Sequence, residues 1–134
     1  MIHIIFEKGV KIRINSFWPV IFGLVGATLL FCLPGDRFSK AGWLEELELD
    51  KVVHIGLFAI LVFLWCLPVQ TRITEPTRLS KMYIWITLSF VSYGVIIEFI
   101  QRDLIPYRSF DPFDIVADAI GCVIGWFAVR KLPK

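Results

Sequence analysis

The sequence has little charge for its length. Of its 134 residues, 19% are charged and 57% are hydrophobic, and the mean hydropathy is +0.71. A soluble domain of this size could not bury that much apolar surface. The composition therefore excludes an ordinary soluble domain and indicates an integral membrane protein.

Cysteine and recognisable catalytic motifs are also scarce. The three cysteines, Cys32, Cys66 and Cys122, are odd in number, lack CxxC spacing and lie within apolar stretches. We expect them to act as small buried apolar residues without redox chemistry. The chain has no GxSxG, HExxH or P-loop pattern. No nucleophile is evident, and the sequence leaves open whether the protein is an enzyme.

Long hydrophobic runs are what the sequence does have. A spanning helix needs about 20 mostly apolar residues, or about 17 at the low end. Four stretches meet this requirement, and the chain shows no internal repeat. The sequence therefore predicts one all-α polytopic membrane domain over residues 1–134, a bundle of four transmembrane helices at 17–33, 52–69, 82–100 and 112–129.

The distribution of Lys and Arg predicts the orientation of this bundle. Three lie in each of the N-terminal arm, the 70–81 loop and the C-terminal tail, against five in the other two loops. Since positive loops stay cytoplasmic, both termini are expected inside. The first stretch lacks a small-residue cleavage site, so we interpret it as a helix rather than a signal peptide.

Two segments lie outside the expected spans. The arm, residues 1–16, alternates apolar and polar residues near its end, which predicts an extended or interface-lying cytoplasmic segment. The outer loop, residues 34–51, has the pattern of a short amphipathic helix that could cover a pocket, with a plain connecting loop as the alternative.

The polar residues of the spans gather at the outer ends of three helices. Asp50 and His54 are four residues apart, Glu98 and Gln101 are three apart, and a third set lies in the sequence DPFDIVAD at 111–118. Each set occupies one face of its own helix. The expected topology brings these faces to one boundary of the membrane and predicts a single polar pocket there.

The chemistry of this pocket follows from its carboxylates. Two carboxylates four residues apart in a low-dielectric setting must share a proton, contact a cation or bind a metal. The candidates for proton transfer or cation binding, and hence the candidate catalytic residues, are His54, Glu98, Asp114 and Asp118. The candidates for ligand binding are Asp50, Lys51, Gln101, Arg108 and Asp111.

Several interpretations of the cluster stay open. Lys51 and Arg108 are suited to contact a phosphate. No metal or other cofactor is assigned, although a metal held by His54 with carboxylates would be Mg²⁺ or Mn²⁺ rather than Zn²⁺.

The alternative is an ion-pair network that only holds the helices together. An ionisable residue at a helix centre costs about 2.5–3.5 kcal/mol, so a cluster favours function.

The last stretch also contains a packing pattern. Ala117, Gly121 and Gly125 repeat every four residues, and small residues at this spacing let helix backbones approach closely in lipid. Asp114 and Asp118 share that face. We therefore expect the two aspartates to point into the bundle.

Three blocks of the sequence resemble the VanZ-like membrane proteins. They are DKVVH at 50–54, EFIQ at 98–101 and RSFDPFDIVADAIGCVIG at 108–125. The family has Asp-Lys-x-x-His, then Glu-x-x-Gln, then an Arg followed by Asp and a polar residue before Gly-x-x-x-Gly. Asp118 stands where the family usually has Asn. The resemblance implies a cell-envelope membrane protein, of a family named for teicoplanin resistance, and supplies no reaction.

Together these features predict a multi-pass protein of the inner (cytoplasmic) membrane. Its outer-leaflet pocket would bind, and in an enzyme form modify, a lipid headgroup or a lipid-linked cell-wall intermediate. The alternatives are a proton- or ion-coupled carrier subunit and a structural subunit that docks a membrane protein partner. No nucleic-acid partner is expected.

Overall fold

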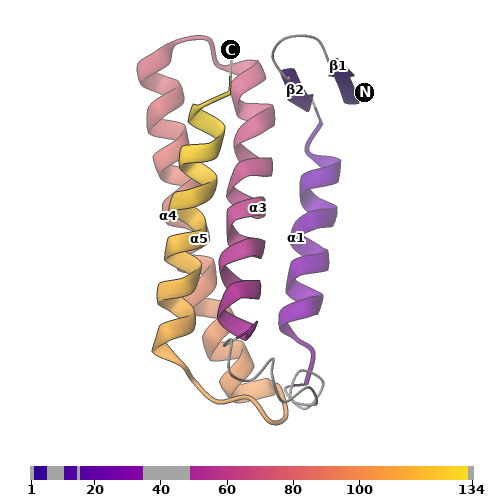
Figure 1. The fold of residues 1–134 in the computed structure, drawn as a ribbon, viewed down its shortest axis with the longest axis vertical. Helices are drawn as coiled ribbons and strands as arrows, with labels where there is room; N and C mark the ends of the chain where they lie inside the picture. Colours follow the sequence, from indigo (N-terminus) through magenta and orange to yellow (C-terminus); the bar gives the residue numbers. More distant parts are fainter. Residues whose placement is uncertain (1, 6–10, 15, 35–48, 133–134) are drawn as a thin grey trace.

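The computed structural model describes residues 2–5, 11–14, 16–34 and 49–132. Within them it contains two strands and four helices (Figure 1). The strands are β1 (Ile2–Ile5) and β2 (Lys11–Ile14). The helices are α1 (Trp18–Phe31), α3 (Leu49–Arg72), α4 (Pro76–Leu104) and α5 (Pro112–Arg130).

Three of these helices are long and apolar enough to cross a membrane. They are α3, α4 and α5, with 24, 29 and 19 residues. Each extends to or beyond the apolar run predicted from the sequence, because polar residues form the helix ends. Glu75 caps α4 by accepting hydrogen bonds from the amides of Thr77 and Arg78, and Pro76 occupies the first turn. The predicted stretches at 52–69, 82–100 and 112–129 are thus confirmed as helices of membrane-spanning length and apolar composition.

The first helix is shorter than the predicted span of 17–33. α1 has 14 residues, which at the usual rise gives about 21 Å, less than the thickness of a hydrocarbon core. It ends at Phe31, and Pro34 restricts Leu33 to non-helical backbone. A fourth crossing therefore stays a prediction. Trp18, Phe22 and Leu29 are nevertheless exposed on α1.

The N-terminal arm departs from an all-helical fold. β1 and β2 pair antiparallel, with Ile2 opposite Ile14 and Ile5 opposite Lys11. The alternation that predicted an extended arm thus forms a two-stranded sheet. Of the predicted outer loop, residues 35–48 lie outside the described residues, and Leu49 to Lys51 already belong to α3.

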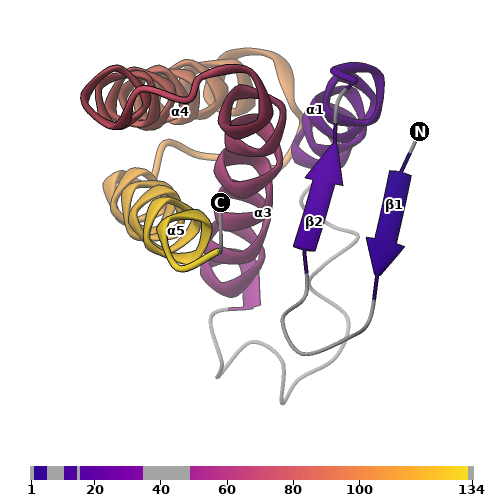
Figure 2. The same cartoon turned by 90° about the horizontal axis from the view of Figure 1, so that it is seen from above.

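α3 is the central helix of the bundle. Figure 2 shows α5 and α4 on one side of it and α1 on the other. The beginnings of α3 and α5 and the end of α4 lie together, whereas the N-terminal sheet and the C-terminus lie at the opposite end (Figure 1). This arrangement places the polar segments at the start of α3, the end of α4 and the start of α5 at one end of the bundle.

Small residues set the distance between α3 and α5. Gly121 and Gly125 are buried, and a methyl group at either would overlap a backbone carbonyl oxygen of α3. At Gly121 the added carbon would meet the Ile55 oxygen and lie 3.0 Å from the Phe58 Cβ. The predicted close approach through the small-residue face is confirmed.

Gly121→Ala is expected to destabilise the bundle, because α3 backbone cannot move aside without separating the helices. Overpacking of this kind costs about 1–3 kcal/mol. The matched control is Gly56→Ala on the facing helix, since an added methyl there has no neighbour within 4 Å. Thermal unfolding in detergent, followed by circular dichroism, should show a loss for Gly121→Ala and none for Gly56→Ala. Equal melting of the two variants would contradict the close-packing assignment.

Candidate functional site

The centre of the polar cluster is a hydrogen bond between α3 and α5. His54 Nδ1 lies 2.7 Å from Asp118 Oδ1, and both side chains are 1% exposed. When Asp118 is ionised its carboxylate can only accept, so in that state Nδ1 carries the proton and Nε2 is left on the other side of the ring. The Phe31 ring of α1 covers the imidazole at 4.7 Å between centroids. The close helix packing therefore delivers an ordered, buried histidine.

α4 makes room for this pair at Gly94. A Cβ at that position would lie 2.5 Å from Asp118 Oδ2 and 3.0 Å from the Asp118 Cβ. Any side chain larger than hydrogen would push the Asp118 carboxylate away from His54. Three helices thus meet at one carboxylate.

Asp111 connects the three helices at the outer edge of the cluster. Its Oδ1 accepts from the Phe113 amide at 2.9 Å and caps α5, and its Oδ2 accepts from Lys51 Nζ at 3.0 Å. Its own amide donates to Glu98 Oε1 on α4. The chain between α4 and α5 is therefore held to both neighbouring helices by one residue.

A second ion pair joins the same loop to the start of α3. Arg108 Nη1 donates to Asp50 Oδ2 at 2.5 Å, and the Arg108 side chain is only 10% exposed. The preceding residue, Tyr107, has a φ of 62°. This left-handed conformation is unfavourable for a residue with a Cβ, by roughly 1–2 kcal/mol. It turns the chain so that Arg108 reaches back to α3.

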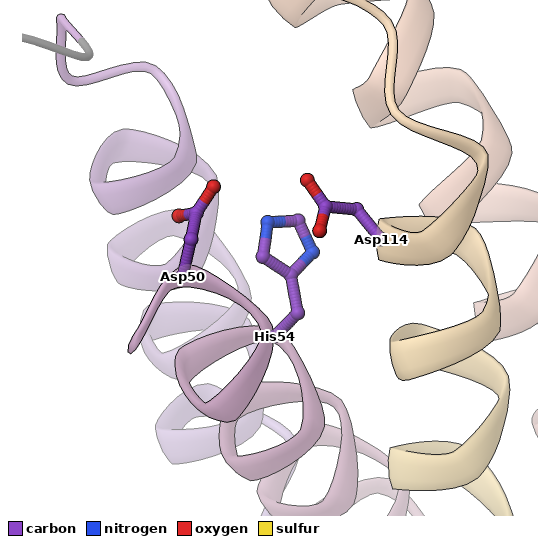
Figure 3. A group of neighbouring side chains, drawn as sticks. All are labelled: Asp50, His54 and Asp114. Carbon is purple, nitrogen blue, oxygen red and sulfur yellow. The ribbon is translucent and has the colours of Figure 1, made fainter. Parts of the chain in front are cut away.

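Asp114 lies within the cluster on the first turn of α5. It is buried, and its Oδ1 is 3.8 Å from Lys51 Nζ, too far for a hydrogen bond. Ligating atoms of Asp50, His54 and Asp114 all lie within 4.8 Å of one another. Figure 3 shows the imidazole between the two carboxylates.

Gln101 forms a hydrogen bond between α4 and α1. Its amide Nε2 donates to the carbonyl oxygen of Phe31, the last residue of α1, at 3.0 Å. This bond satisfies a carbonyl that the end of a helix leaves without an intrahelical partner. Binding of a ligand by Gln101 stays a prediction, and the contact gives the residue a role in joining α1 to α4.

The structure brings all nine predicted site residues to the same end of the bundle. The four candidates for proton transfer are buried, and the others lie around them. Their chemical roles remain predictions. Sequence reasoning missed Gly94, Phe31 and Tyr107 as contributors. Gly94 precedes Glu98 by four residues and so shares its helical face, which was the available signal.

The cluster is acidic and contains polar atoms without partners. Asp50, Glu98, Asp111, Asp114 and Asp118 are its five carboxylates among the described residues, and Lys51 and Arg108 are the cations paired with them. Among the carboxylates and the histidine of the cluster, four buried atoms have no hydrogen-bond partner in the described part of the chain: His54 Nε2, Glu98 Oε2, Asp114 Oδ1 and Asp118 Oδ2. Chemically, such a site can hold protons, a cation or a group that donates hydrogen bonds.

Comparison with known proteins gives little further information. No family model matches the chain, and no solved structure matches it. A protein of Schizosaccharomyces pombe that is described as uncharacterized is 39% identical over 75 residues. The match covers 54% of this chain and 41% of the yeast protein, so the chain spans about two fifths of that relative.

Gly94→Ala is expected to separate Asp118 from His54 because the added methyl takes the space of the carboxylate. Nitrogen-15 NMR of the imidazole in detergent micelles should show the Nδ1 signal moving to that of a ring without a carboxylate partner. Gly26→Ala is the control, since an added methyl there has no neighbour within 4 Å. An imidazole spectrum unchanged by Gly94→Ala would contradict the three-helix contact.

The pH dependence of stability in Asp111→Asn tests the ion pair between Asp111 and Lys51. The Phe113 amide, and then Lys51, lower the pKa of the Asp111 carboxyl. A lowered pKa adds stability above the unfolded value of about 3.9, and this stability is lost as pH falls through the folded value. Asn keeps the cap but loses the half-exposed ion pair, so the variant should be less stable by about 0.2–1 kcal/mol at neutral pH.

The stability difference between wild type and Asp111→Asn should then shrink as pH falls below the unfolded pKa of Asp111. Urea or detergent denaturation of both proteins at several pH values measures it. A difference that stays constant, or that grows towards low pH, would exclude the ion pair with Lys51 as its source.

Proposed function

We propose that this chain is a VanZ-like membrane protein of the cell envelope that binds the headgroup of a membrane lipid or of a lipid-linked cell-wall intermediate. The observation that supports it is the set of four unpartnered buried atoms on the carboxylates and the histidine of the cluster, at one end of the bundle. Each such atom costs about 1–3 kcal/mol. A network that served only to join helices would be expected to satisfy its own members, so these atoms point to a ligand.

The chemistry of a headgroup suits the cluster. In this proposal the unpartnered acceptors on Glu98 and Asp114 receive hydrogen bonds from amine or hydroxyl groups. Lys51 and Arg108, whose side chains are 25% and 10% exposed, contact the phosphate and give up part of their pairing with carboxylates. The apolar surface of the surrounding helices accommodates the lipid chains.

The proposed orientation places this cluster in the outer leaflet. It requires four crossings, including α1, with both termini in the cytoplasm and the protein in the inner membrane. The excess of Lys and Arg in the arm, the 70–81 loop and the tail supports it, as does the shared location of the sheet and the C-terminus (Figure 1). A contribution to teicoplanin resistance belongs to the same proposal and rests on the family resemblance.

Modification of the bound headgroup would need the His54–Asp118 pair. A buried imidazole held by a carboxylate can accept a proton at Nε2, which is the step that general base catalysis requires. This enzymatic form of the proposal is secondary to binding, since the sequence offers no nucleophile pattern.

A proton- or ion-coupled carrier is the second candidate. The buried His54–Asp118 pair favours it, because intramembrane ionisable pairs also occur in proton pathways. Proton flux into liposomes that contain the protein tests this candidate. Flux that Asp118→Asn abolishes would support the carrier, and flux indistinguishable from empty liposomes would exclude it.

Native mass spectrometry of the protein in mild detergent tests lipid binding. Wild type should retain a lipid, and Glu98→Gln and Asp114→Asn should lose most of it because each removes an acceptor in the cluster. Asp103→Asn is the matched control, an acid-to-amide change in an exposed ion pair with Arg102 on α4. Absence of bound lipid from wild type, or equal loss from the control, would contradict the proposal.

In cells, the same substitutions connect binding to the envelope. Asp114→Asn, Asp118→Asn and Glu98→Gln should each lower teicoplanin tolerance while the protein inserts normally, whereas Asp103→Asn should leave tolerance unchanged. If the three variants are instead absent from the membrane or unfolded, the cluster is a structural ion-pair network.

A further inference from the structure

We infer that Asp50, His54 and Asp114 form a binding site for a divalent cation. Ligating atoms of the three residues lie within 4.8 Å of one another. Asp50 and His54 are one turn apart on α3, and Asp114 faces them from the first turn of α5 (Figure 3). The site is therefore assembled by the same helix pair that the small residues bring together.

The orientation of His54 is an independent observation that points to a metal. His54 is fully buried, and its Nδ1 lies 2.7 Å from Asp118 Oδ1. Its Nε2 is buried and has no hydrogen-bond partner among the described residues, and the ring lies between the side chains of Asp50 and Asp114 (Figure 3). A histidine that binds a metal through one ring nitrogen almost always donates the N–H of the other to a carboxylate, a backbone carbonyl or water, and Asp118 is placed to accept such a bond from His54.

The charge of the cluster favours the same ligand. Its carboxylates outnumber its cations, and Lys51 stands 3.8 Å from Asp114. A divalent ion would neutralise two negative charges and would give a partner both to His54 Nε2 and to Asp114 Oδ1. A single proton shared by two carboxylates would neutralise only one charge.

The ligand set selects the kind of ion. In an octahedral site with ligands at about 2.0–2.1 Å, neighbouring ligands lie about 3 Å apart and opposite ligands about 4 Å apart. The three side chains, whose ligating atoms now lie within 4.8 Å of one another, must therefore move closer together when the ion binds. Two carboxylates suit either ion, and the imidazole favours Mn²⁺ over Mg²⁺. Three protein ligands leave positions for water. The inference does not depend on the proposed lipid, because every ligand belongs to the chain.

Titration of the lipid-stripped protein in detergent with Mn²⁺ tests the site. Electron paramagnetic resonance reports free Mn²⁺, whose six-line signal should disappear until one equivalent is bound per chain. The melting temperature should rise with the Mn²⁺ concentration, since an ion that binds only the folded protein stabilises it. Mg²⁺ should compete with Mn²⁺ at higher concentration.

Substitutions assign the ligands. His54→Gln and Asp114→Asn should each weaken Mn²⁺ binding at least about tenfold, as expected for loss of a ligand. Because these two side chains are buried, Asp50→Asn is the second test, at a position whose side chain is 34% exposed and whose amide oxygen can still accept from Arg108. Asp103→Asn, on the exposed surface at the same end of the bundle, should bind Mn²⁺ like wild type.

Either of two results would overturn the inference. One is wild-type protein that shows no saturable binding of Mn²⁺. The other is binding that Asp50→Asn and Asp114→Asn leave unchanged while both variants melt like wild type without metal. If wild type retains a lipid in native mass spectrometry but does not bind Mn²⁺, the metal site is refuted and the proposed function stands.

Discussion

The close approach of α3 and α5 is the constraint on which the rest of the structure depends. Gly121 and Gly125 allow the two backbones to meet, and the same face of α5 continues towards its N-terminus as Asp118 and Asp114. Without that approach, Asp118 could not reach His54 at 2.7 Å. In lipid, helices gain little from apolar burial against one another, so packing of small residues and interhelical hydrogen bonds decide their arrangement.

The cluster combines contacts of two kinds. At its outer edge, Asp111 caps α5, holds Lys51 and anchors Glu98, while Arg108 reaches Asp50 from a strained turn. These contacts fix the loop between α4 and α5 and account for its charges. In the interior, His54, Asp114 and Asp118 keep polar atoms that the described residues do not satisfy. The contacts at the edge of the cluster thus fix the positions of His54, Asp114 and Asp118, whose unpartnered polar atoms can bind a ligand.

Much of this arrangement could be predicted from the sequence, because its signals are periodic. Hydropathy located three membrane-length helices, and the spacing of Asp50 with His54 and of Asp114 with Asp118 gave the faces that meet. The predicted span at 17–33 is longer than α1, because hydropathy alone does not show that Pro34 stops the helix before the apolar run ends. Gly94 and the Phe31 carbonyl were missed because their importance arises from contacts between helices distant in sequence. The alternation of apolar and polar residues in the N-terminal arm predicted an extended segment, but it could not show that β2 pairs with β1.

The central claim is that the buried carboxylate of Asp114 serves to bind a ligand and does not hold the bundle together. The free energy of unfolding of Asp114→Leu, measured in detergent without lipid or divalent ions, tests it most directly. Leu matches the branched shape of Asp and removes a buried carboxylate oxygen that has no partner among the described residues. We expect the variant to be as stable as wild type or more stable, because replacing such groups by apolar ones is often neutral or stabilising. A loss of about 3 kcal/mol or more, as when a buried ion pair is broken, would contradict the claim.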